Sequence, residues 1–357
     1  MRRLIHLTLL MALSVGSLWT GAAQAVVIKN LYEALVPVDT QSREERKTAL
    51  TTGLIEVITR VSGKTLLLSE DPEDPLAMAI QKPTRYTRQF RYRKNTRGNS
   101  RLNLWIKYDE KAINNLLQSS DLPVWGHTRP STLAWIALSE NGRRKLLSNS
   151  DQHEVKTAMK WIANKRGLPL TFPLMDLTDR GSISISDIWG NFEDRVLRAS
   201  QRYNPEAIIV GRLYRSSAGV WSVRWSTYQQ GQRKDVSADD VRDIYVAVAP
   251  VVARTAEEMA ERFALSSVEE VREDVTISIA GINSLKEFNR IGKYLKSLAA
   301  VNDVSPVMVG EDVAIFKLVT KGGRLGVAQA INLGHTLAEQ VPAPPAGVAD
   351  LAYQLVQ

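Results

Sequence analysis

The run Thr132-Leu133-Ala134-Trp135-Ile136-Ala137-Leu138 decides the fold of the middle of this chain. Its residues are almost continuously apolar, and a strand with that pattern is buried on both faces of a sheet. Segments with helical spacing and two further apolar strands, 168–172 and 207–211, follow it. This order of strands and helices predicts a parallel or mixed α/β sheet covered by helices.

Outward from this run, the 357-residue chain divides into several segments. A central α/β module is predicted over residues 126–265, preceded by an N-terminal α+β module with a basic hairpin over 26–125. A C-terminal β-α-β-β-α module is predicted over 266–340, and a proline-containing tail over 341–357 is expected to be extended. The predicted fold class is therefore mixed α/β and α+β, in several modules.

The first 25 residues have the pattern of a secretory signal peptide. Arg2 and Arg3 precede an apolar stretch, and the small residues that end at Ala25 form an A-x-A cleavage pattern. The alternative is a retained N-terminal anchor helix, for which the apolar stretch is short. We therefore expect cleavage after Ala25 and a periplasmic location. Loss of these residues lowers the formal net charge from +8 to +6.

The absence of cysteine limits the chemistry open to the protein. Disulfides, thiolate zinc sites, a cysteine nucleophile and the lipid anchor of a lipoprotein are excluded. The sequence also lacks nucleophile-elbow, phosphate-loop, dinucleotide-binding and EF-hand patterns. The three histidines after the leader, His127, His153 and His335, lie in separate segments. We therefore predict no metal, no cofactor, no catalytic residues and a protein that is not an enzyme.

Basic residues concentrate in the predicted hairpin of the N-terminal module. Nine of them lie between Lys82 and Lys107, and this window contains no acid. Such a patch attracts anions, although a solvated strand face is the alternative. The candidate residues for binding an anion or a partner are Arg85, Arg88, Arg91, Arg93, Lys94, Arg97 and Arg101. Strand alternation places Arg85, Arg91 and Arg93 on one face. We expect peripheral contact with anionic membrane or cell-wall polymer, and no nucleic acid.

Two tryptophans near module edges, Trp125 and Trp189, are candidate contact anchors. Tryptophan is enriched at the binding hot spots of protein interfaces. The alternative is ordinary packing in a core or on a sheet.

Several short stretches together resemble the bacterial domain of unknown function 2066 (DUF2066) family. They are 31–34, 36–38, 58–63, 187–192, 207–213, 280–282, 294–295 and the pair Trp221 and Trp225. The resemblance covers nearly all of the chain after the leader. It implies an exported proteobacterial protein without an assigned activity, and it supplies no catalytic residues. The middle module is also loosely similar to N-terminal domains of periplasmic helper proteins associated with Tol or with activation of penicillin-binding proteins.

Three functions remain open on the sequence. The first is a non-enzymatic periplasmic protein that binds an envelope protein partner and supports an assembly. The second is a carrier of an anionic small molecule or lipid, which predicts an apolar pocket with basic residues at its mouth. The third is a hydrolase of an envelope polymer that uses dispersed carboxylates.

Overall fold

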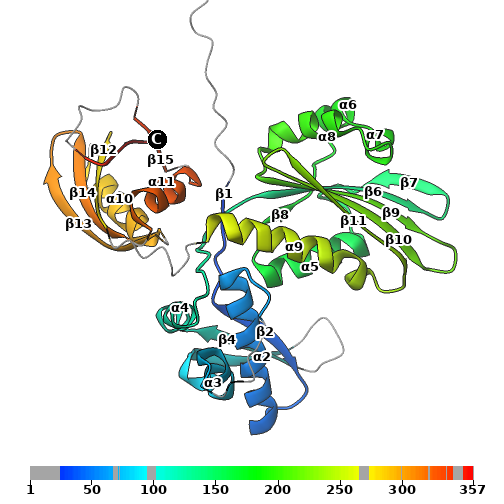
Figure 1. Ribbon diagram of the computed structural model, residues 1–357, viewed down its shortest axis with the longest axis horizontal. Coiled ribbons are helices and arrows are strands. Elements are labelled where there is room, and N and C mark those ends of the chain that lie inside the picture. Colours follow the sequence, from blue (N-terminus) through cyan, green and yellow to red (C-terminus); the bar gives the residue numbers. More distant parts are fainter. Residues whose placement is uncertain are drawn as a thin grey trace, which may run out of the picture.

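The computed structural model describes residues 25–66, 71, 73–94, 102–264, 273–298, 300–320, 322–334, 336–340 and 349–356. Within them, three groups of sheets and helices follow one another along the chain (Figure 1). Nearly all of the predicted signal peptide, residues 1–24, lies outside the described residues. Among the described helices, none is both long enough and apolar enough to cross a membrane.

The first module is a three-stranded antiparallel sheet of order β2-β4-β3 with helices on one face. In chain order it contains β2 (Glu33–Val38), α2 (Arg43–Ser62), α3 (Pro75–Gln81), a 3₁₀ helix (Pro83–Arg85), β3 (Thr87–Lys94), β4 (Leu102–Tyr108) and α4 (Glu110–Ser119). Helix α2 begins at the N-cap Ser42, whose hydroxyl accepts from the Glu45 amide, and ends at Gly63. Alternate residues of β2 and β4 pack under this helix, and the other residues form an outer face.

The central module is a six-stranded mixed sheet of order β11-β10-β9-β6-β7, in which β8 also pairs with β6. It contains β6 (Thr132–Glu140), β7 (Arg143–Leu146), α5 (Glu154–Arg166), β8 (Leu170–Thr171), α6 (Leu177–Ser182), α7 (Ile185–Trp189), α8 (Glu193–Ser200), a 3₁₀ helix (Gln201–Tyr203), β9 (Ala207–Arg215), β10 (Trp221–Gln229), β11 (Gln232–Val241) and α9 (Ile244–Phe263). Strand β6 runs parallel to β8 and β9, as the order of elements predicts.

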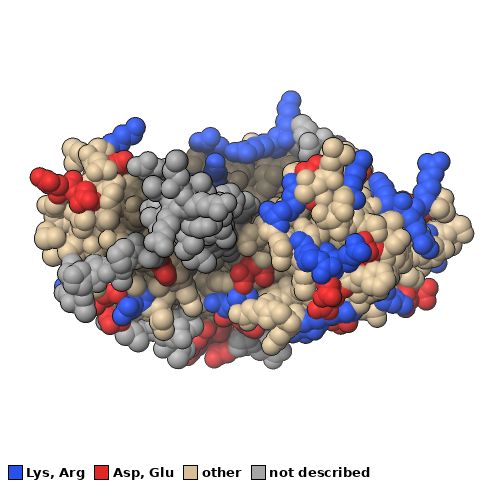
Figure 2. All heavy atoms as spheres, turned by 90° about the horizontal axis from the view of Figure 1, so that it is seen from above, with Lys and Arg blue, Asp and Glu red and all other residues tan. Residues whose placement is uncertain are grey.

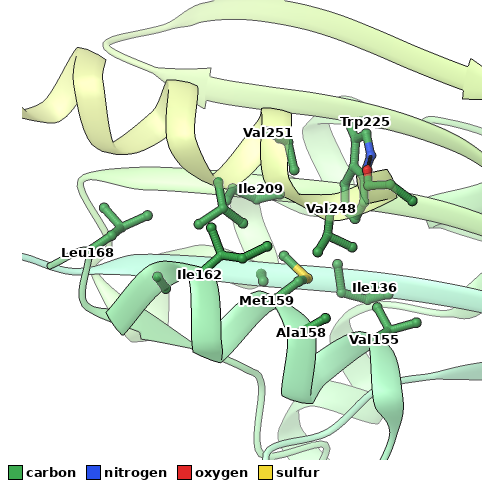
Figure 3. Close-up of a cluster of buried hydrophobic side chains, with 14 of the residues drawn as sticks. Ile136, Val155, Ala158, Met159, Ile162, Leu168, Ile209, Trp225, Val248 and Val251 are labelled. Atoms are coloured by element: carbon green, nitrogen blue, oxygen red, sulfur yellow. Dashed lines mark hydrogen bonds between the residues drawn. The ribbon is translucent and has the colours of Figure 1, made fainter. Parts of the chain in front are cut away.

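The deciding run forms β6, and its two faces belong to two different cores. Ala134 and Ile136 pack with α5 and α9, whereas Leu133 and Trp135 pack with α7 and α8. Figure 3 shows the first of these cores, where side chains of α5 and α9 meet those of the sheet. Residues 133–138 of the strand are therefore all apolar, because helices cover both sides of it. This confirms the predicted mixed α/β class.

The third module is a five-stranded sheet of order β13-β14-β12-β16-β15 with α10 and α11 packed on it. It contains β12 (Asp274–Ala280), α10 (Leu285–Ser297), β13 (Val301–Val309), β14 (Val313–Thr320), α11 (Gly323–Asn332), β15 (Leu337–Glu339) and β16 (Leu351–Leu355). Strand β16 runs parallel to β12, so the predicted module boundary at residue 340 is too early. Its alternate residues Leu351, Tyr353 and Leu355 are buried, and this burial keeps the segment in the sheet.

Candidate functional site

The outer face of the first sheet carries an aromatic ring between cations. Leu35, Trp105 and Arg91 lie side by side on β2, β4 and β3. The guanidinium carbons of Arg93 and Arg91 lie 4.9 and 5.9 Å from the centroid of the Trp105 ring. The indole nitrogen of Trp105 donates to Glu33 Oε2 at 3.0 Å. These contacts hold the ring in place and keep both cations beside it.

A groove of about 710 Å³ lies between this face and helix α5. One wall includes Leu35, Arg93 and Trp105, and the other includes Trp161 and Lys165 of α5. The end of β1 (Ala25–Val27) and the link from it to β2 also line the groove. Volumes of this size are typical of small-molecule and cofactor sites. The groove therefore joins residues that are far apart in the sequence.

Large apolar side chains stand half open to solvent in the groove. Trp161 is 50% exposed, Leu35 is 51% exposed and Val27 is 60% exposed. The Trp161 ring packs edge-on against Tyr245 with centroids 5.4 Å apart, and Lys165 Nζ lies 4.4 Å above the same ring. Because its neighbours already fix the ring, Trp161 loses little side-chain entropy when a partner covers it.

The acidic side chains of the groove have cationic partners, whereas one of its arginines lacks an acidic partner. Glu56 accepts from Arg60 and lies 3.2 Å from Lys165 Nζ, while Glu33 is held by Trp105 and lies 3.7 Å from Lys107. Arg93 has no carboxylate partner among the described residues. The acids are thus offset by cations within the wall, and a free positive charge remains at the mouth.

Arg129 fixes the two walls relative to each other. Its side chain is fully buried and makes four hydrogen bonds, all to main-chain carbonyls. The acceptors are Arg60 at the end of α2, Gly167 at the end of α5, and Trp125 and Gly126 in the linker, at 2.7–2.9 Å. Burial lowers the pKa of Arg129 to about 9, which leaves it charged at neutral pH. A cation at two helix C-termini is favoured by both helix dipoles.

Glycine is required at the ends of α2 and α5, where these two helices meet the junction. Gly63 and Gly167 end α2 and α5 with φ angles of +69° and +64°. A Cβ atom at Gly63 would lie 2.2 Å from that of Ala260, and one at Gly167 would lie 2.2 Å from Arg129 Nη1. At the edge of this junction Lys64 forms an ion pair with Glu261, and Arg166 donates to the Gly63 carbonyl at 3.2 Å. The first two modules are therefore held as one unit.

His127 adds a pH-dependent contact at this junction. Its Nδ1 bonds to the Ile28 carbonyl at 2.8 Å and its Nε2 lies 3.4 Å from Glu110 Oε1. The contact with Glu110 raises the pKa of His127 above its usual value. A raised pKa in the folded state stabilises the protein below about pH 6.5, and this contribution is lost as the pH rises through the raised pKa.

The expected consequence is a difference between the wild type and His127→Gln that depends on pH. The wild type should be more stable than the variant by up to about 1 kcal/mol near pH 5.5, and the difference should shrink toward pH 8.5. Urea unfolding at both pH values measures this difference. A difference that grows with pH would contradict the assignment.

The predicted basic residues do not form one face. Arg91 and Arg93 lie on the outer face beside Trp105, but a β-bulge between Thr87 and Gln89 breaks the alternation. Arg85 lies before the bulge in a 3₁₀ helix, so its predicted grouping with Arg91 and Arg93 is wrong. Arg88 and Lys94 are exposed on β3, and neither pairs with a carboxylate among the described residues. Arg97 and Arg101 lie outside the described residues.

The two predicted tryptophan anchors have different positions. Trp125 is fully buried under Arg129, whose guanidinium carbon lies 4.0 Å from the ring centroid, so its prediction as a surface anchor is wrong. It is buried because the module edge on which it lies is an internal junction. Trp189 is partly buried on α7, with the Arg144 guanidinium 5.3 Å from its ring.

Sequence reasoning missed Trp161, the most prominent aromatic residue of the groove. Its signal is its position within α5. The buried residues Val155, Met159 and Ile162 mark one face of that helix, and Trp161 falls outside this face. A large aromatic residue on the solvent side of an amphipathic helix indicates a contact surface.

Comparison with known proteins gives a family for part of the chain. Residues 25–126 match the family described as Domain of unknown function (DUF8605). The matching family is thus not DUF2066, and the resemblance inferred from short stretches is wrong. Motifs of two to seven residues, many of them ordinary strand and helix patterns, were too short to separate the two families. The DUF8605 segment contains Leu35, Arg93 and Trp105, whereas Trp161 lies beyond it.

The other comparisons add no functional argument. No curated protein matches the chain. A crystal structure of prolyl-tRNA synthetase from Cryptosporidium parvum, complexed with L-proline and AMP, matches at 10% identity with a TM-score of 0.18. The match covers 63% of this chain and 50% of that chain, so this chain aligns with about half the length of the synthetase. A TM-score of this size supports no conclusion about fold or function.

Proposed function

We propose that this protein is an exported, non-enzymatic binding protein that supports an assembly of the bacterial envelope by docking a protein partner. The observation that carries the proposal is the groove between the first sheet and α5. It combines half-exposed Trp161 and Leu35 with the cation Arg93, and aromatic and arginine side chains dominate binding energy at protein interfaces. The leader pattern of residues 1–25 supports the periplasmic location.

The charge of the groove defines the partner further. The groove acids are held by cations of the walls, while Arg93 and neighbouring Arg91 have no carboxylate partner among the described residues. The complementary partner is a protein segment that carries apolar side chains flanked by Asp or Glu. Nearby cations such as Arg88 and Lys94 would add a weaker peripheral contact with anionic membrane or cell-wall polymer.

Site-specific cross-linking in living cells tests the proposal. A photoreactive residue is placed at Leu35 or Trp161, and at Leu177 of α6 as a control that is 88% exposed but outside the groove. The expected result is one envelope protein captured from both groove positions and not from the control. Equal capture at all three positions, or none at the groove, would contradict the docking site. Turnover of an envelope polymer by the purified protein would instead favour the hydrolase alternative.

Charge reversal separates the outer face from the rest of the hairpin. Arg91→Glu combined with Arg93→Glu is expected to weaken partner capture about tenfold or more, because both changes place negative charge at the mouth. The fold should be retained, since each cation–π contact with Trp105 contributes only about 0.5–1 kcal/mol. Arg85→Glu is the matched control, because Arg85 lies outside the outer face. A loss as large with Arg85→Glu would remove the outer face from the docking site.

A further inference from the structure

At one edge of the central sheet, two successive connections of the chain lead to helices on opposite faces. Strand β6 leads through β7 into α5, and the parallel neighbour β8 leads into α6, α7 and α8. Helices α5 and α9 cover one face of the sheet and α6–α8 cover the other (Figure 1). Strand β8 pairs with the first two residues of β6 and β7 pairs with its last four, so the two connections diverge beside the middle of β6.

A cavity of about 600 Å³ lies at this divergence. Residues that follow the β6–β7 turn, 144–151, form one wall, and residues that follow β8, 174–185, form the other. The volume lies within the range of about 300–1,000 Å³ that is typical of small-molecule sites. The cavity is separate from the docking groove, because the two have no lining residue in common.

Two arginines of the cavity are fixed in position and still have free donors. Nε of Arg180 donates to the Met175 carbonyl at 2.8 Å, and the Arg144 guanidinium lies against the ring of Trp189. Among the described residues, neither arginine pairs with a carboxylate, and their terminal nitrogens donate to none of them. Guanidinium groups held in this way are suited to bind the oxygens of a phosphate or carboxylate in pairs.

Asp151 is the one carboxylate among the lining residues, and its charge is offset. Its Oδ2 accepts from the amide and hydroxyl of Ser148 at 2.7 and 2.8 Å, and its Oδ1 lies 3.6 Å from Lys145 Nζ. Although burial opposes ionisation, these contacts hold the pKa of Asp151 below its usual value. Because the charge of Asp151 is offset, Arg144 and Arg180 give the cavity a net positive charge. The surrounding α6–α8 face of the module is also rich in Lys and Arg (right-hand part of Figure 2).

The remaining lining includes an apolar wall, formed by Leu146, Leu174, Met175, Ile183 and Ile185. Ser148, Ser150 and Ser184 add hydroxyl groups beside this wall. Leu174 is 55% exposed, and Met175 has a φ angle of +55°, which is costly for a residue with a side chain. The Met175 amide donates to buried Asp179 at 2.8 Å, and this contact holds the unusual conformation. Strained backbone of this kind concentrates at ligand sites.

We infer that this cavity binds an anionic amphiphile, a molecule with a phosphate or carboxylate head and an apolar body. Arg144 and Arg180 bind the head, and the apolar wall covers the body. A free inorganic anion would leave that wall exposed to water, so the apolar part is required for tight binding. The site is independent of the proposed docking function.

Calorimetric titration of the purified protein tests the inference with octyl phosphate, octanoate, inorganic phosphate and uncharged octanol. We expect saturable binding of octyl phosphate or octanoate, and binding at least tenfold weaker for inorganic phosphate and for octanol. Arg144→Gln combined with Arg180→Gln should weaken binding of the amphiphile at least tenfold, and Leu174→Ser should weaken it several-fold. Arg143→Gln, an exposed neighbour that does not line the cavity, should change it less than twofold.

The contrary outcomes are distinct. Equal affinity for inorganic phosphate and octyl phosphate would overturn the role of the apolar wall. Unchanged binding by the double arginine variant would place the ligand elsewhere, and absence of binding by both amphiphiles at millimolar concentration would overturn the site. The thermal unfolding midpoint of each variant without ligand shows that it is folded.

Discussion

Replacement of Arg129 by methionine is expected to lower the free energy of unfolding of the first two modules by about 3–5 kcal/mol. The Arg129 side chain is fully buried, and its guanidinium donates four hydrogen bonds to main-chain carbonyls. Methionine fills much of the same volume but has no donor. Each buried carbonyl left without a hydrogen-bond donor lowers the free energy of unfolding by about 1–3 kcal/mol. Removal of the buried charge offsets part of this loss.

Tryptophan fluorescence during urea unfolding measures this change well. All seven tryptophans after the leader lie between residues 105 and 225, so their signal reports the first two modules and not the third. Arg254→Met is the matched control, because Arg254 is half exposed and Glu258 is its one carboxylate partner among the described residues. That variant should change the free energy of unfolding by less than about 1 kcal/mol. A loss below about 1 kcal/mol for Arg129→Met would show that other contacts hold the junction.

The role of Arg129 also links stability to the proposed docking site. Its acceptors include the last turn of α2, which packs on the first sheet, and the end of α5, which forms the other wall of the groove. A variant that weakens this contact should therefore separate the face that carries Trp105 from the helix that carries Trp161. Arg129→Lys keeps the charge but cannot reach four acceptors, so we expect an effect between those of the wild type and Arg129→Met.

Local patterns in the sequence predicted the elements of the fold but not its junctions. The apolar run of β6, the capped helix that ends at Gly63 and the strand at 207–211 each carry their own signal. The sequence signal for strand β16 is weak, because its five residues form a strand only when β12 lies beside them. No local pattern separates the buried Arg129 from an exposed arginine, since its four acceptors come from three separate segments.

The candidate site was only partly predictable for the same reason. Charge density indicated the hairpin, and Arg91 and Arg93 do lie at the mouth of the groove or beside it. The bulge that separates Arg85 from them depends on pairing with β4, which alternation alone does not reveal. Proximity of Trp125 to a module edge indicated exposure, whereas the neighbouring modules cover it. A groove between two modules exists only once their packing is known.

Truncation of Trp161 to alanine is expected to reduce capture of the partner about 30-fold or more, the largest loss for any single substitution in the groove. Removal of a central tryptophan from an interface commonly costs about 2 kcal/mol or more, which corresponds to that factor. The folded protein should lose little stability, because the ring is 50% exposed and its main neighbours are Tyr245 and Lys165 on the surface.

Two controls make this result specific. Leu177→Ala removes an apolar side chain that is 88% exposed outside the groove, and should leave capture unchanged. Trp161→Phe keeps an aromatic ring against Tyr245 and should retain most of the affinity, whereas a purely structural role for Trp161 would lower stability and capture together. If Trp161→Ala binds the partner as the wild type does, the partner docks elsewhere. The solvent-facing side of α5 then has no part in binding. Trp161 is the only residue of this helix that is at once large, apolar and exposed.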